Sequence, residues 1–157
     1  TSLTRMDKPH TSALRRGRFS EQGRIYLLTT VTERRQPVFS DLRLARVTIG
    51  VLRDSDDRGL TETLAFVLMP DHLHWLLSLQ TGELSSIARR SKSVSARLVN
   101  QARSVSGKRL WQRGFHDHAL RHEEDIRAVA RYVVANPLRT GLVERVGDYP
   151  HWDAAWL

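Results

Sequence analysis

The chain has 157 residues, 40% of them hydrophobic, and a formal net charge of +8 at pH 7. This length and hydrophobic content predict one globular domain, and the positive charge favours a polyanionic partner, most often a nucleic acid. The sequence has no cysteine, which excludes disulfides and thiolate catalysis and fits a reducing cytoplasm. No apolar run approaches the length of a membrane span, which argues against a membrane helix. We expect a cytoplasmic protein and, because of its positive charge, one associated with the nucleoid.

The N-terminal segment is rich in basic residues and lacks the apolar core of a signal peptide. We expect residues 1–16 to form a flexible basic arm and residues 17–157 to form a single domain. Arg15 and Arg16 at the end of this arm, and Arg18 just after it, could fold onto DNA.

Hydrophobic periodicity and turn residues predict alternating strands and helices along the chain. The expected elements are a strand at 25–32, a helix from Ser40 or Asp41 to about 53, a strand at 61–69, a strand at 72–79 after a Pro70-Asp71 turn, a helix at 83–103, two short strands at 109–112 and 115–120, and a helix at 123–136. This order predicts an α+β fold close to a ferredoxin-like arrangement, in which an antiparallel sheet of four to five strands has helices packed on one face.

Two histidines share one face of the strand expected at 72–79. Because side chains alternate along a strand, Leu73 and Trp75 should point into the core, and His72 and His74 to the other face. Their Cα atoms would lie about 6.5–7 Å apart, so both imidazoles could bind one metal ion. The alternative is a half-exposed pair without a function, and a catalytic metal usually has a third protein ligand.

A tyrosine on the last predicted helix also departs from the core pattern. Tyr132 lies about 130° from the centre of the apolar stripe of its helix, so it should point to solvent or into a cleft. Asn136 lies four residues later on the same side, and its amide oxygen could be a third metal ligand. The alternatives are a surface aromatic packed on the tail and an asparagine that ends the helix before Pro137.

A second histidine pair offers a rival site. His116 and His118 share one face of the strand expected at 115–120, where they could bind metal, contact DNA or be ordinary polar sheet residues. Asp71 could orient a ligand histidine, or serve only as the turn residue.

The histidine pair and the later tyrosine resemble the motifs of the HUH single-strand DNA nucleases, in which a bulky hydrophobe separates two histidines. Within that group the chain resembles the REP-associated tyrosine transposases. The matching stretches cover most of residues 17–157 in family order: GRFSEQGRIYLLTTVTERRQPVF, FVLMPDHLHWLL, LWQRGFHDHALR, RYVVANPLRTGLV and HWDAAWL.

The resemblance implies that His72 and His74 are ligands of a divalent metal, Mg²⁺ or Mn²⁺, and that Tyr132 is the nucleophile. Related insertion-sequence enzymes often carry a glutamine four residues after the tyrosine as third ligand, and Asn136 stands at that position here. The implied substrate is single-stranded DNA with a palindromic hairpin and a GTAG-like tetranucleotide, cut through a 5′-phosphotyrosine intermediate. The resemblance favours a monomer and leaves a dimer open.

Basic side chains along the chain are candidates for phosphate contacts, although each could simply be solvated. Besides the arm, they are Arg89, Arg90, Lys92, Arg97, Lys108, Arg109 and Arg113. Three other functions remain open at this point: a metallonuclease that uses activated water, a non-catalytic hairpin-binding protein, and an RNA-binding module of ferredoxin-like fold.

Overall fold

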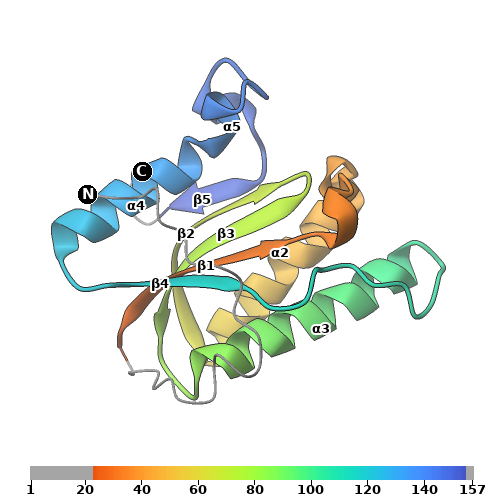
Figure 1. Cartoon of the computed structure of the whole chain (residues 1–157), viewed down its shortest axis with the longest axis horizontal. Helices are drawn as coiled ribbons and strands as arrows, with labels where there is room; N and C mark the ends of the chain where they lie inside the picture. The colour runs from red at the N-terminus through yellow and green to blue at the C-terminus, as the bar shows by residue number, and fades with distance from the viewer. Residues whose placement is uncertain (1–22, 155–157) are drawn as a thin grey trace.

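The computed structural model describes residues 23–154 (Figure 1). The predicted arm at 1–16, with Arg15 and Arg16, and the following Arg18 lie outside the described residues. The main elements are β1 (Ile25–Val31), α2 (Leu42–Asp57), β2 (Thr61–Met69), β3 (His72–Leu79), α3 (Leu84–Ala102), β4 (His116–Leu120), α4 (Glu123–Val134), α5 (Asn136–Arg139) and β5 (Trp152–Ala154), with short 3-10 turns at Glu33–Arg35, Val38–Ser40 and Val146–Asp148.

The strands form one five-stranded sheet in the order β4-β1-β3-β2-β5, and all neighbouring strands are antiparallel. The α+β class and the antiparallel sheet predicted from the sequence are therefore confirmed. The β2–β3 hairpin has the predicted bounds because Pro70 and Asp71 make a two-residue turn between two largely apolar strands. This hairpin brings β3 to the centre of the sheet.

Helices cover both faces of the sheet, not one as expected (Figure 1). On one face α2 and α3 pack over a core that includes Leu73, Trp75 and Leu77 of β3. On the other face α4 packs over Leu76 of β3 and its apolar neighbours in β1 and β2. Helix α4 has to cover this second face because both faces of the central strands carry buried apolar side chains.

Three local elements differ from the prediction. Residues 109–112 form no strand, because Trp111 makes only an isolated bridge to Thr32. The helix expected at 123–136 ends at Val134, and the short α5 follows it, with Pro137 in its first turn, where its missing N–H costs nothing. Strand β5 was not predicted, and it adds an edge to β2.

Helix α2 begins where a capping residue allows it to. The Asp41 side chain accepts a hydrogen bond of 2.9 Å from the Arg43 backbone N–H, which settles the choice between Ser40 and Asp41. Within residues 23–154, no helix has the length and apolar character needed to cross a membrane.

Candidate active site

The two histidines of β3 lie on the sheet face that α4 covers, at the end of the sheet next to the Pro70-Asp71 turn. His74 is 5% exposed, and its ring centroid lies 4.8 Å from that of His72, with the ring planes 77° apart. The backbone pairing of β3 with β1 and β2 fixes both residues, since His74 lies opposite Thr29 on one side and Val67 on the other. The central strand of the sheet therefore holds the two imidazoles next to each other.

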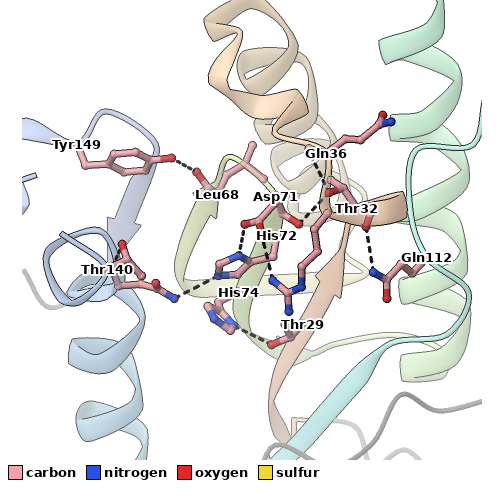
Figure 2. A network of polar contacts seen from close by, with 12 residues as sticks. Thr29, Thr32, Gln36, Leu68, Asp71, His72, His74, Gln112, Thr140 and Tyr149 are labelled. Atoms are coloured by element: carbon pink, nitrogen blue, oxygen red, sulfur yellow. Dashed lines mark hydrogen bonds and ion pairs between the residues drawn. The ribbon is translucent and has the colours of Figure 1, made fainter. Parts of the chain in front are cut away.

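Each imidazole has one ring nitrogen held by a neighbouring side chain (Figure 2). His72 Nδ1 lies 2.7 Å from Asp71 Oδ1, and His74 Nδ1 lies 2.7 Å from Thr29 Oγ1. When each Nδ1–H donates to its oxygen, the lone pair of each ring is on Nε2. This is the arrangement found behind metal-binding histidines, where the second nitrogen fixes the tautomer and orients the ring.

Burial favours the neutral form of both rings. Burial lowers the pKa of His74 to about 3, and the nearby charges of His72, Arg139 and His116 act in the same direction. Burial also lowers the pKa of His72, and the adjacent Asp71 carboxylate only partly opposes it. Neutral imidazole is the form that binds metal, so the electrostatics of this site suit metal ligation without a competing proton.

Asp71 is itself held in place by Arg35. The Arg35 Nη1 donates to Asp71 Oδ2 at 3.2 Å, while the other carboxylate oxygen bonds His72. Partial burial raises the pKa of Asp71, but the hydrogen bonds and charges of His72 and Arg35 bring it below its usual value. Both Arg34 and Arg35 adopt left-handed backbone conformations, with φ of 55° and 51°. Such conformations are unfavourable for arginine, and here they place the Arg35 side chain against Asp71.

Helix α4 brings Tyr132, and helix α5 brings Asn136, to the two histidines of β3. The Tyr132 ring centroid lies 6.4 Å from that of His74, and the half-buried tyrosine faces the site rather than open solvent. Asn136 is 5% exposed, and its Nδ2 lies 3.4 Å from His72 Nε2. The Thr140 hydroxyl donates to the Asn136 backbone carbonyl at 3.0 Å. Four predicted site residues, from two strand and two helix positions, therefore meet in one place.

Arg139 is a neighbour of this site that the sequence reading did not single out. Its guanidinium carbon lies 3.7 Å from the centroid of the Tyr132 ring, and its Nη1 donates to the Tyr132 backbone carbonyl. Thr29, Arg35 and Arg139 were all missed because nothing in the sequence pattern pairs them with the site. Arg139 stands seven residues after Tyr132 in the stretch RYVVANPLRTGLV, but this spacing does not indicate that its guanidinium covers the ring.

The rival histidines of β4 lie on the same sheet face as the β3 pair. His116 lies opposite Thr29, and His118 opposite Leu27. Strand β1 therefore separates them from the histidines of β3. His116 is still near enough for its charge to lower the pKa of His74. Among residues 23–154, no three histidine, cysteine or acidic side chains come together to hold a metal ion. A three-ligand site there needs a donor of another kind, such as the Asn136 amide.

Two of the residues predicted to contact DNA, Lys92 and Arg90, make hydrogen bonds within the protein. The Lys92 ammonium donates to the backbone carbonyls of Gln112 and Gly114 at 2.7 and 2.6 Å, and Arg90 Nη2 donates to Asp54 Oδ2 at 3.0 Å. The other residues of the predicted set that lie in the described structure are exposed: Arg89, Arg97, Lys108, Arg109 and Arg113. Among them, Arg109 has a long ion pair of 3.9 Å with Glu33.

A groove of about 300 Å³ runs between α3 and the segment 109–115. Arg89, Lys92 and Arg109 line it, over a floor that includes Trp111 and Phe115. Both aromatics are 5% exposed, and Trp111 Nε1 donates to Ser95 Oγ at 2.9 Å, so they belong to the core. The groove therefore offers cationic walls more than stacking surfaces.

Comparison with known proteins gives consistent matches. The family model for IS200-like transposases matches residues 22–136. A candidate REP-associated tyrosine transposase of Haemophilus influenzae is 30% identical over 100 residues, and a REP-associated tyrosine transposase of Escherichia coli is 28% identical over 101 residues. These matches cover 57% and 64% of this chain, and only 57% and 58% of the two relatives.

A solved structure extends the similarity to the fold. The structure of a REP-associated tyrosine transposase bound to a REP hairpin superposes with a TM-score of 0.68 at 28% identity. The superposition covers 86% of this chain and 79% of that chain. It spans more of the chain than either sequence match.

Proposed function

This chain belongs to the family of IS200-like transposases, and from that premise we propose that it cuts single-stranded DNA through a covalent phosphotyrosine intermediate. Tyr132 is the nucleophile, and His72, His74 and Asn136 hold a divalent cation. The observation that carries the proposal is the meeting of these four side chains, with the Tyr132 ring centroid 6.4 Å from that of His74 and the Asn136 amide 3.4 Å from His72 Nε2.

The residues present fit a divalent cation. Asp71 and Thr29 occupy the two Nδ1 atoms, which leaves both Nε2 lone pairs for a metal, and Nε2 of His72 lies beside Asn136. The amide can present either its nitrogen or its oxygen by a half-turn of its side chain, and a cation requires the oxygen. Two imidazoles and one amide suit Mn²⁺ better than Mg²⁺, which prefers oxygen ligands. When bound, either ion would withdraw charge from the scissile phosphate and stabilise its transition state.

The tyrosine carries out the bond exchange. Its phenolic oxygen gives up its proton to solvent and forms a bond to phosphorus, while the bond between phosphorus and the 3′ oxygen breaks. The 3′ oxygen leaves with the electron pair and takes up a proton, which yields a 5′-phosphotyrosine and a free 3′-OH. One phosphodiester replaces another, so rejoining needs no external energy source. The main demand on the protein is to place Tyr132 in line with the leaving oxygen.

The proposed substrate is single-stranded DNA that folds into a palindromic hairpin next to a GTAG-like tetranucleotide. A relative with a similar fold has been solved with a REP hairpin, and the net charge of +8 suits a polyanion. The exposed Arg89 and Arg109 in the groove beside α3 could bind its phosphates. Because strand and helix residues of one chain supply the whole site, we propose that a monomer is sufficient for cleavage.

The test is a covalent-adduct assay on a hairpin oligonucleotide labelled on the 3′ side of the expected cut. In Mn²⁺, label should stay with wild-type protein on a denaturing gel and be absent from Tyr132→Phe. Tyr26→Phe is the matched control, because it makes the same change on the opposite, α2–α3 face of the sheet. Cleavage without adduct by Tyr132→Phe would identify a water-using nuclease. Hairpin binding with no cleavage by wild type would identify a binding protein.

A further inference from the structure

The junction between α4 and α5 gives the proposed nucleophile an unusual support. Helix α4 ends at Val134, so Tyr132 lies in its last turn, where backbone carbonyls have no hydrogen-bond partner within the helix. Arg139, the last residue of α5, donates from Nη1 to the Tyr132 carbonyl. A cation in this position is also favoured by the negative end of the helix dipole.

The same guanidinium covers the face of the tyrosine ring. Its central carbon lies 3.7 Å from the ring centroid, which is a close cation–π contact. One side chain therefore holds Tyr132 at two points, its backbone and its ring. Because the half-buried ring otherwise faces the site, this contact restricts the direction in which the phenolic oxygen can point.

The charge of Arg139 also reaches the histidines. It is among the nearby charges that lower the pKa of His74. Within residues 23–154, Arg139 makes no ion pair with an acidic side chain, and the residue as a whole is exposed. A positive charge thus stands beside the place where the proposed chemistry would bring a phosphate.

We propose that Arg139 is a positioning residue for Tyr132, which holds the ring in the direction needed for attack. This inference rests on the proposed function and adds a residue to it. Lysine cannot replace arginine here, because a point charge on a flexible stem cannot lie flat on the ring and bond the carbonyl at once.

The first measurement needs no catalysis. Protein labelled with 3-fluorotyrosine has three tyrosine resonances, and Tyr132→Phe assigns one of them. In metal-free, DNA-free protein, Arg139→Met and Arg139→Lys should shift and alter the width of the Tyr132 resonance. Arg131→Met should leave it unchanged, since Arg131 is a neighbouring cation in the last turn of α4, whereas the cation over the ring and on the Tyr132 carbonyl is Arg139. An unchanged Tyr132 resonance in Arg139→Met would overturn the proposal.

The second measurement is the rate of adduct formation at saturating hairpin, together with the Kd for that hairpin. Displacement of a reacting group by about 1 Å can cost on the order of 100-fold in rate. We expect Arg139→Met and Arg139→Lys to lose rate on that scale while the Kd changes less than about threefold. Full rescue by lysine would show a charge effect only, and a change confined to Kd would show a DNA contact; either refutes positioning.

The two measurements separate this inference from the proposed function. If wild type forms no adduct, the proposed function fails, yet the fluorine spectra still decide whether Arg139 holds the ring. If wild type forms the adduct and the Arg139 variants form it equally fast, the function stands and the inference fails. Circular dichroism of each variant shows whether α4 is still folded.

Discussion

Neighbouring threonines of β1 provide a sharp test of the hydrogen bond behind His74. Thr29 is 3% exposed and lies on the α4 face, where its Oγ1 is 2.7 Å from His74 Nδ1. Thr30 is 4% exposed on the opposite face, and its Oγ1 has no hydrogen-bond partner among residues 23–154. Valine has nearly the shape of threonine and favours strands equally, so Thr29→Val and Thr30→Val differ mainly in the bond that is lost.

The expected effects have opposite signs. Thr29→Val leaves a buried imidazole N–H without an acceptor, and such a group costs about 1–3 kcal/mol. Thr30→Val removes a buried hydroxyl that is already unsatisfied, so it should leave stability unchanged or raise it by up to about 1 kcal/mol. Urea unfolding in the absence of metal measures both differences.

The same pair tests the role proposed for His74. Loss of a hydrogen bond behind a ligand histidine typically weakens metal binding by about 10–100-fold. Calorimetric titration with Mn²⁺ should show this loss in Thr29→Val and wild-type affinity in Thr30→Val. Equal stabilities for the two variants would refute the hydrogen-bond reasoning. Equal and unreduced Mn²⁺ affinities would refute the assignment of His74 as a ligand held by Thr29.

Two other variants test residues whose side chains are engaged in the fold. Lys92→Met removes ammonium bonds to the Gln112 and Gly114 carbonyls, and because bonds to charged groups are worth about 1.5–3 kcal/mol we expect a loss of at least 1.5 kcal/mol in urea unfolding; an unchanged midpoint would contradict this. Hydrogen bonds and charges of Arg58 and Arg90 hold the pKa of Asp54 below its usual value of 3.8. The ion pairs of the Asp54 carboxylate therefore stabilise the fold above pH 3.8, and this stabilisation is lost as the pH falls through the lowered pKa. Asp54→Asn should therefore be less stable than wild type at pH 6, and the difference should shrink below pH 4 in urea titrations at each pH; a difference independent of pH would be contrary to this account.

Much of the fold could be predicted because the signals are local. The bounds of β2 and β3 follow from two apolar runs and from Pro70-Asp71 between them. The side of α4 that carries Tyr132 and Asn136 follows from helical spacing. The signal for helices on both sheet faces was also present, since Leu76 continues the histidine face of β3 with a buried apolar residue. A sheet covered on one face would have left Leu76 exposed.

The remaining features depend on contacts that local patterns do not contain. Thr29 meets His74 across 45 residues, and Arg35 meets Asp71 across 36. Arg35 reaches Asp71 only because two successive arginines adopt left-handed backbone conformations that no propensity favours. Strand β5 has three residues, too few for an alternating pattern, and it exists because β2 offers a free edge.

The arrangement explains why one sheet face can serve catalysis without weakening the fold. The core over Trp75, under α2 and α3, contains none of the proposed site residues. On the other face α4 packs through Val129, Val133 and their neighbours, and the site occupies the end of that same interface. The histidines are fixed by the central strand, so the position of Tyr132 depends on how α4 is seated and on the junction with α5. The position of the proposed nucleophile would therefore be set at the end of α4, where Arg139 of α5 bonds the Tyr132 carbonyl and covers its ring.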